Sequence, residues 1–305
     1  MATVGLKRVV VAGGTGLVGR RLVRALTEQG TQVSVLSRNP ERLELPAGAA
    51  AQRWERLANL MDGADAVINL AGEGIADQRW SPARKTAILR SRTEATARLV
   101  AAMDACTHLP SALVNASAIG YYIPRNELPV DERATAGSGF LTEVCRAWEA
   151  EATAESAAGV RVAILRIGVV LAREGGALPK MAHPVRWFAG CKLGTGRQGL
   201  SWIHVDDLVA MFIEAARNPA WQGVFNATAP EPLSNEAFTR RIAQRLHRPL
   251  LPVPGFLTTA ATKLLLGEMA EALLLQGAFV LPAHAQSLGF QFRFPAAETA
   301  LEDLL

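Results

Sequence analysis

The sequence contains few cysteines, and none of them occurs in a pattern that serves a metal site or a disulfide framework. Cys106, Cys145 and Cys191 are odd in number and have neither a Cys-x-x-Cys partner nor histidines at metal-ligand spacing. The cysteine pairs that are typical of small secreted proteins are therefore absent. We expect a protein of the reducing cytoplasm with no metal site.

Long hydrophobic runs and blocks of like charge are also missing. The longest apolar stretch near the C-terminus, from Ala270 to Leu275 onward, is too short and too interrupted to span a bilayer. Met1 to Val11 leads into a strand-like run without a signal-peptide pattern. The net charge of +4 is scattered among acidic residues, which is typical of a solvated surface. The sequence predicts neither a membrane nor a nucleic-acid partner.

What is present is an alternation of short apolar runs with helix-length amphipathic segments. The predicted strands are residues 9–12, 33–36, 66–70, 112–116, 162–167 and 224–227, and the predicted helices are residues 17–29, 84–105, 141–155 and 202–216. Runs of β-branched residues between helices are typical of strands that are buried on both faces of a parallel sheet. Right-handed crossovers then give an α/β doubly wound parallel sheet, a Rossmann-like fold.

The composition changes after Leu171, where glycine and proline become frequent, and the chain is mostly helical from Pro230 onward. We therefore expect two units. Residues 1–171 plus 201–228 form a dinucleotide-binding domain. Residues 172–200 plus 229–305 form a smaller, mostly helical C-terminal lobe over the carboxyl edge of the sheet.

A glycine-rich turn joins the first strand to the first helix, where residues 13–19 read Gly-Gly-Thr-Gly-Leu-Val-Gly. Gly13 permits the tight turn, Gly16 lets the backbone approach a pyrophosphate, and Gly19 lets the helix pack closely on the strand. The helix N-terminus adds free N–H groups and a partial positive charge for the phosphates. The turn therefore predicts dinucleotide binding, with contacts from Gly13, Thr15, Gly16, Leu17, Val18 and Gly19.

The end of the second strand distinguishes between the two nicotinamide dinucleotides. It reads Ser37-Arg38-Asn39 and has no acid before Glu41. An acid at this point holds the ribose 2′-hydroxyl of NAD, whereas an arginine and a hydroxyl suit a 2′-phosphate. The alternative is that Arg38 is an ordinary surface arginine. We predict that the cofactor is NADP(H), bound by Ser37 and Arg38.

The Gly-x-x-Gly-x-x-Gly spacing resembles the short-chain dehydrogenase/reductase superfamily, in its extended and atypical branches. Further strings resemble one atypical family, the NADP-dependent epimerase family, which has bacterial, animal and chloroplast members. They are found at residues 69–73 (NLAGE), 79–80 (RW), 91–92 (SR), 117–122 (SAIGYY), 194–198 (GTGRQ), 201–207 (SWIHVDD), 226–232 (NATAPEP) and 267–271 (GEMAE). One departure is Ile123, where the family is expected to carry glycine.

This resemblance implies further cofactor contacts. A turn of small residues after the strand at 66–70 would line the adenine-ribose side of the cofactor through Asn69, Leu70, Ala71 and Gly72. Arg92 would reach back toward the cofactor, or else it lies on a solvated helix face. Val170, beside Val169, would lie where the superfamily's backbone passes the nicotinamide.

The catalytic pair that is usual in this superfamily is missing. Its enzymes use a serine, a tyrosine and a lysine four residues after that tyrosine, and the lysine lowers the tyrosine pKa. Ser117 lies where the serine belongs, but Tyr121 and Tyr122 are the only tyrosines, and neither has a lysine four residues later. The helix at 141–155 carries Leu141 and Cys145 at the usual positions of the pair.

Two hypotheses follow. In the first, Tyr121 or Tyr122 replaces the missing acid in an oxidoreductase-like or nucleotide-sugar epimerase-like enzyme, with Arg125 acting on the tyrosine electrostatically. In the second, the protein binds NADP(H) without hydride transfer, as a regulatory binding protein, and the tyrosine pair packs at the cleft rim. Cys145 fits a small core residue better than a reactive thiol.

The substrate side is less defined. Arg197 is a candidate anion ligand for a phosphorylated or nucleotide-linked small molecule, and Trp202 is a candidate to stack on its ring. The alternative is that His204, Asp206 and Asp207 begin a helix and fix the loop by hydrogen bonds. The sequence is also compatible with a homodimer.

Overall fold

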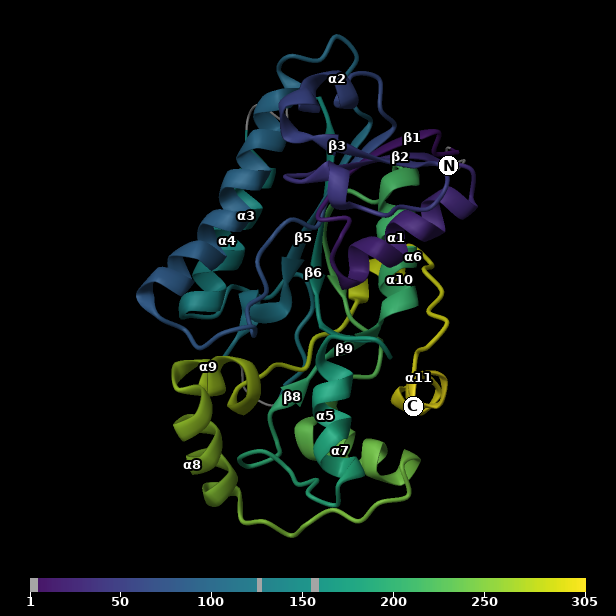
Figure 1. Ribbon diagram of the computed structural model, residues 1–305. Helices are drawn as coiled ribbons and strands as arrows, with labels where there is room; N and C mark the ends of the chain where they lie inside the picture. The colour runs from purple at the N-terminus through teal and green to yellow at the C-terminus, as the bar shows by residue number, and fades with distance from the viewer. Residues whose placement is uncertain (1–4, 125–127, 155–158) are drawn as a thin grey trace.

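The computed structural model describes residues 5–124, 128–154 and 159–305 (Figure 1). Seven parallel strands form one sheet in the order β10-β6-β5-β4-β1-β2-β3. They are β1 (Arg8–Ala12), β2 (Gln32–Ser37), β3 (Ala49–Arg53), β4 (Ala66–Asn69), β5 (Ala112–Ala118), β6 (Arg161–Ile167) and β10 (Gly223–Ala227). The doubly wound parallel fold is therefore confirmed. Arg125, suggested above as a partner of the tyrosine pair, lies outside the described residues.

Helices cover both faces of the sheet (Figure 1). One face carries α2 (Leu57–Met61), α3 (Pro82–Met103) and α4 (Phe140–Ala152), and the other carries α1 (Leu17–Glu28), α6 (Val205–Arg217) and α10 (Ala283–Ser287). Side chains of successive β1 residues point to opposite faces of the sheet. Val9 and Val11 pack with the α1 and α6 side chains, whereas Val10 packs with α3. This two-sided burial explains the near-continuous apolar runs of these strands.

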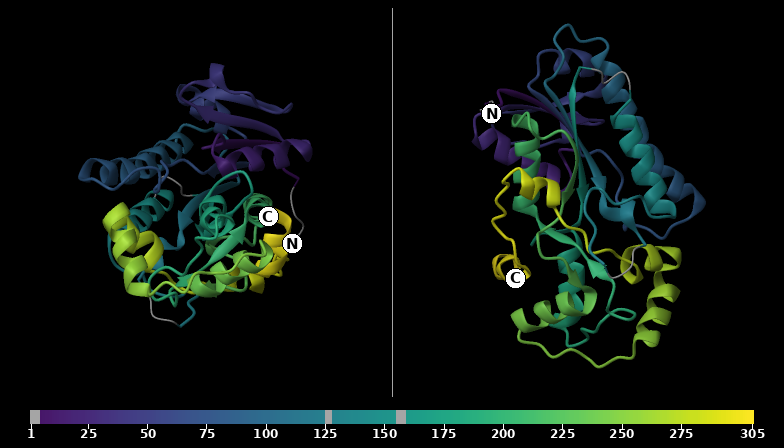
Figure 2. Two further views of the ribbon diagram at one scale, coloured as in Figure 1. Left: turned by 60° about the horizontal axis from the view of Figure 1, so that its bottom comes forward. Right: turned by 180° about the vertical axis from the view of Figure 1, so that it is seen from behind.

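The C-terminal lobe lies beyond the carboxyl ends of the strands (Figures 1 and 2). It contains α5 (Ala177–Arg186), α7 (Asn235–Arg245), α8 (Gly255–Leu266), α9 (Glu268–Ala270), a π-helical turn (Glu271–Leu275), α11 (Ala297–Leu304), and the short strand pair β8 (Gly199–Leu200) with β11 (Leu233–Ser234). The strand pair β7 (Val169–Leu171) with β9 (Trp202–His204), which the sequence assigned to the dinucleotide-binding domain, packs against the same helices. Leu178, Trp202, Phe238 and Leu301 belong to the hydrophobic core of the lobe. This core positions the lobe over the edge where a ligand of a doubly wound sheet binds.

Some details differ from the expectations. The strand β3 was not predicted, because its sequence is mostly alanine, which has little strand propensity. The predicted helix 202–216 begins as strand β9, and α6 starts only at Val205, where the His204 side chain accepts a hydrogen bond from the Asp206 backbone.

Residues 283–292, assigned to the lobe from the sequence, also contact the sheet. The helix α10 packs on β10, and Phe290 packs edge-on against Trp221. The division of the chain into two units therefore stays a prediction. None of the described helices is long and apolar enough to cross a membrane.

Short 3₁₀ turns complete the chain trace, at Pro40–Arg42, Trp54–Arg56 and Ile119–Tyr122. The last of these follows directly from β5. It carries the two tyrosines of the sequence onto the carboxyl edge of the sheet, next to the lobe.

Candidate functional site

The glycine turn after β1 has the geometry that its sequence predicts. Gly13 has φ +77°, and a Cβ there would lie 2.5 Å from the Leu70 carbonyl. A Cβ at Gly19 would lie 2.2 Å from the Gly13 carbonyl oxygen, so α1 packs directly on the turn. At Gly16, which is exposed, a Cβ would meet nothing closer than 3.6 Å. The protein itself therefore gives no steric reason for glycine at Gly16, which fits a position that a pyrophosphate approaches.

The N-terminus of α1 is also free to meet an anion. No side chain of the described residues caps this end of the helix, whose N-cap is Gly16. Thr15 is exposed, and Leu17 and Val18 are partly exposed. The amide groups of the first turn therefore remain as donors for phosphate oxygens.

Asn69 holds the next turn in place through its buried side chain. Its Nδ2 donates to Thr96 Oγ1 at 2.8 Å and to Asn115 Oδ1 at 2.7 Å, and its Oδ1 accepts from the Ala71 amide at 3.0 Å. Both amide protons are therefore committed within the protein. Asn69 thus shapes the turn of residues 69–72, and the backbone of Leu70 and Ala71 lies against the glycine turn.

Arg92 extends from α3 across the same turn. Its guanidinium donates to the carbonyls of Ile88 at 2.9 Å and Glu73 at 3.0 Å, and it lies 5.2 Å from the Trp148 ring centre. Gly72 makes room for it, because a Cβ there would lie 3.0 Å from Arg92 Cζ. Burial lowers the pKa of this guanidinium. Arg92 is therefore not an ordinary surface arginine, and its contact with the cofactor stays a prediction.

Ser37 and Arg38 stand at the carboxyl end of β2, next to the end of β1 that carries the glycine turn. The Ser37 Oγ accepts a hydrogen bond from the Asn39 amide at 3.1 Å. The Arg38 side chain is exposed and forms no ion pair with any residue that the structure describes. Its guanidinium is available to an external phosphate.

Val170 lies in β7, directly after the sheet strand β6, and pairs with Ile203. The chain beyond β7 returns to the glycine turn, since a Cβ at Gly176 would lie 3.2 Å from the Leu17 side chain. The expected contacts with both ends of the cofactor therefore lie along one edge of the sheet.

A buried polar network occupies the place of the usual catalytic groups. The Ser117 hydroxyl donates to Glu149 Oε1 at 2.6 Å. Arg166 donates to both oxygens of the same carboxylate, at 2.8 and 2.7 Å, and to the Tyr122 hydroxyl at 2.8 Å. The Tyr122 hydroxyl in turn donates to Asn226 Oδ1 at 2.8 Å. The network links β5, α4, β6 and β10.

The two tyrosines have different environments. Tyr122 is fully buried with its hydroxyl paired on both sides, and burial raises its pKa to about 12. The structure does not support the hypothesis that Tyr122 donates a proton to a substrate. Tyr121 is partly exposed, and Arg166 Cζ lies 3.3 Å from the centre of its ring. Of the two tyrosines, Tyr121 alone keeps access to solvent.

Arg166 and Glu149 were missed by the sequence reasoning. The signal for Arg166 was present, since this arginine follows the apolar run Val162–Leu165 within the strand. Its partner was not identifiable, because Glu149 lies on a separate helix whose pattern gives no indication of a buried carboxylate.

Cys145 is a structural thiol. It is buried, its Sγ contacts the Ala118 carbonyl at 3.4 Å, and burial raises its pKa to about 11. The thiolate that nucleophilic chemistry requires is therefore disfavoured.

The predicted substrate residues fall in two different places. Arg197 is exposed on the loop before β8. Trp202 is fully buried in the lobe core, its Nε1 donates to the Glu231 carbonyl at 3.0 Å, and its ring packs near Phe238. The expectation that Trp202 stacks on a substrate is wrong, because β9 places this ring in the hydrophobic core.

The hydrogen bonds of residues 204–207 agree with the alternative prediction that these residues begin a helix and fix a loop. His204 begins α6, and the Asp207 carboxylate accepts from the backbone amides of Arg293 and Phe294 at 2.8 and 3.0 Å. These residues fix the segment before α11.

Gly16 and Gly19 provide a matched pair of substitutions. Gly16→Ala is expected to leave the free energy of unfolding nearly unchanged and to weaken NADPH binding about tenfold or more, because the methyl group enters only the ligand's space. Gly19→Ala is expected to cost about 3 kcal/mol or more of stability, because its Cβ overlaps the Gly13 carbonyl. Urea unfolding and NADPH fluorescence titration measure the two effects. Unchanged NADPH affinity in folded Gly16→Ala would contradict the assignment.

The Tyr122 hydroxyl is expected to ionise at a higher pH than an exposed tyrosine does. Its folded pKa of about 12 exceeds the unfolded value of about 10, so its contribution to stability is complete below pH 10 and is lost as the pH rises toward 12. With only two tyrosines, the absorbance of tyrosinate after a rapid pH jump reports each one. We expect a step near pH 12 that disappears in Tyr122→Phe. A step for Tyr122 near pH 10 in the folded protein would contradict its burial.

Comparison with known proteins agrees with this geometry. The profile of the NAD dependent epimerase/dehydratase family matches residues 9–227, and a domain of unknown function, DUF1731, matches residues 257–304. The chloroplastic epimerase family protein SDR39U1 homolog of Arabidopsis thaliana is 41% identical over 306 residues, which covers 97% of this chain and 86% of that protein. An epimerase family protein of Staphylococcus saprophyticus is 36% identical over 305 residues, 98% of this chain and 100% of that protein.

Solved structures agree as well. The human epimerase family protein SDR39U1 (isoform 2), solved with NADPH, superimposes with a TM-score of 0.86 at 32% identity, covering 97% of this chain and 98% of that one. A nucleoside-diphosphate sugar epimerase from Corynebacterium glutamicum gives a TM-score of 0.78 at 32% identity, covering 99% of this chain and 58% of that one. The chain therefore belongs to the NAD dependent epimerase/dehydratase family, as an atypical short-chain dehydrogenase/reductase related to the SDR39U1 proteins.

Proposed function

We propose that this protein binds NADP(H) and acts as an oxidoreductase on a small molecule, with Tyr121 as the proton donor. The observation that carries the proposal is the position of Tyr121 at the carboxyl end of β5, partly exposed and held by Arg166. This is the edge of a doubly wound sheet at which ligands bind.

The cofactor part of the proposal rests on the fit of the residues. Gly16 leaves space for a pyrophosphate, the first turn of α1 offers its amides, and the Arg38 guanidinium is free of ion pairs with the described residues. The human relative with 32% identity was solved with NADPH. When bound, NADPH would supply a hydride, and the chain would have to orient the acceptor and provide a proton.

The roles of the hydroxyl groups follow from their hydrogen bonds. The Ser117 proton is committed to Glu149, so Ser117 can accept a hydrogen bond but has no proton free to donate. Tyr122 is committed in the same way. Tyr121 is the hydroxyl of this cluster that can donate to a substrate oxygen. Arg166 positions it by stacking on its ring.

A second function is favoured by one specific observation. Ser117, which the superfamily uses to orient its substrate, is buried here and its only proton is donated to Glu149. This supports a regulatory protein that binds NADP(H) without turnover. In either case the three free cysteines are compatible with the reducing cytoplasm.

Arg38 tests the choice of cofactor. Removal of a charge-assisted hydrogen bond to the 2′-phosphate is expected to weaken NADPH binding about tenfold to hundredfold in Arg38→Ala, with little change for NADH. Fluorescence titration with both dinucleotides measures the difference, and Arg90→Ala on α3 is the matched control. Equal losses for NADPH and NADH, or tighter binding of NADH by the unaltered protein, would contradict the proposal.

Tyr121 tests the chemistry. A screen of carbonyl compounds and nucleotide sugars, followed by NADPH fluorescence, should identify a substrate that the unaltered protein turns over. Tyr121→Phe removes only the hydroxyl, so we expect kcat to fall about 100- to 10,000-fold while NADPH affinity stays within about twofold. Tight NADPH binding without turnover on any compound would favour the regulatory function, and full activity of Tyr121→Phe would exclude Tyr121 as the donor.

A further inference from the structure

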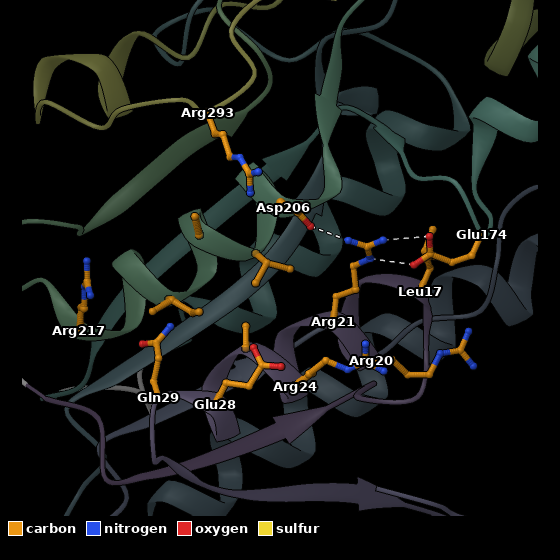
Figure 3. A pocket seen from close by; sticks show the side chains of 14 residues that line it. Leu17, Arg20, Arg21, Arg24, Glu28, Gln29, Glu174, Asp206, Arg217 and Arg293 are labelled. Atoms are coloured by element: carbon orange, nitrogen blue, oxygen red, sulfur yellow. Dashed lines mark hydrogen bonds and ion pairs between the residues drawn. The ribbon is translucent and has the colours of Figure 1, made fainter. Parts of the chain in front are cut away.

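A groove of about 690 Å³ lies between α1 and α6 and meets the cofactor turn only at Leu17 (Figure 3). Its floor is apolar and is made by Ala25 of α1 and by Val209 and Ile213 of α6. Its lining extends from Leu17 to Gln29, so it follows the whole of α1, a length of about 18 Å at 1.5 Å per residue.

The rim of the groove is rich in arginine (Figure 3). Arg20 and Arg24 line it from α1, Arg217 from α6, and Arg293 from the segment before α11. Arg20, Arg24 and Arg293 form no side-chain ion pair with any residue that the structure describes, and Arg217 is paired with Glu214. Cationic side chains therefore stand on both sides of the apolar floor.

The acidic residues of the groove are mostly neutralised at one end. Arg21 binds Glu174 through two hydrogen bonds of 2.8 and 3.0 Å and Asp206 through one of 2.6 Å, which ties α1 to α6 (Figure 3). The Arg21 guanidinium holds the pKa of Glu174 at about 2, so this pair stays ionised at neutral pH. Of the carboxylates that line the groove, only Glu28 forms no ion pair with a described residue. Arg20 lies near Glu174 and Arg217 pairs with Glu214, so Arg24 and Arg293 are the rim arginines that face no paired carboxylate.

We propose that this groove binds an acidic amphipathic helix of a partner protein. Two adjacent helices with an apolar floor between them accept the apolar face of a third helix. The arginines on both rims then meet carboxylates on the flanks of that helix, which adds specificity and speeds association.

The shape of the groove favours a helix over a small anion. The groove is long and open, whereas the arginines are distributed along it rather than converging on one point. A helix of about 12 residues spans the same 18 Å. Its side chains at i, i+4 and i+7 fall on the floor, and its acidic residues fall on the rims.

The test is selection from a displayed library of helical peptides on the full-length protein. We expect enrichment of sequences with apolar residues at i, i+4 and i+7 and with Asp or Glu on the flanks. The best enriched peptide should bind about tenfold or more weakly to Arg24→Glu/Arg293→Glu, and its affinity should fall as salt rises. Ala210→Trp, which fills the groove without changing its charge, should weaken binding to a similar extent.

Arg90→Glu, a charge reversal on α3, is the matched control and should bind the peptide as the unaltered protein does. Circular dichroism and urea unfolding check that every variant is folded. The proposal is overturned if no acidic sequence is enriched, if the double variant binds as well as Arg90→Glu, or if ATP or pyrophosphate binds the groove and displaces the peptide completely at equal concentration. Self-association that Ala210→Trp abolishes, in the absence of peptide, would likewise overturn it in favour of a second copy of this chain.

Discussion

The carboxyl edge of the sheet depends on the buried ion pair between Arg166 and Glu149. A guanidinium inside a sheet is costly unless its charge is matched and its donors are used. Glu149 supplies the charge from α4 and accepts two hydrogen bonds, and the Tyr122 hydroxyl accepts a third. Loss of either partner of such a pair costs about 3–5 kcal/mol. Because Glu149 also accepts the hydrogen bond of the Ser117 hydroxyl, the same pair decides which hydroxyls can still donate to a substrate.

The proposed cofactor side of the site depends on a different interaction, which is close contact between two backbone turns. The turns after β1 and β4 touch at Gly13 and Leu70, where a side-chain carbon at Gly13 would not fit. The buried Asn69 side chain fixes the second turn, because its Nδ2 donates two hydrogen bonds and its Oδ1 accepts one from the Ala71 amide. These contacts involve none of the residues in the Arg166 network. The dinucleotide turns can therefore be kept while the hydroxyl groups around Ser117 and Tyr121 change. This separation explains why a glycine turn of ordinary form occurs together with an unusual tyrosine pair.

Much of the fold could be predicted because its signals are local. β-branched runs and glycine positions depend on neighbours in the sequence, so the parallel sheet and the turn at Gly13 were predicted correctly. Trp202 was not, because its surroundings continue a helical pattern, and only the pairing of β9 with β7 shows that the ring is in the core. The role of Arg166 depends on a partner on another helix. Pairing between distant elements is information that a single sequence does not display.

The central claim is that this edge of the sheet places Tyr121 beside a bound NADP(H). A crystal structure with NADPH tests it most directly. We expect the 2′-phosphate to contact Arg38, and the Tyr121 hydroxyl to lie within about 3 Å of the position that a reacting oxygen would take above the nicotinamide. A Tyr121 hydroxyl turned away from the nicotinamide, with no other proton donor at that position, would contradict the enzymatic account and leave a protein that only binds its cofactor.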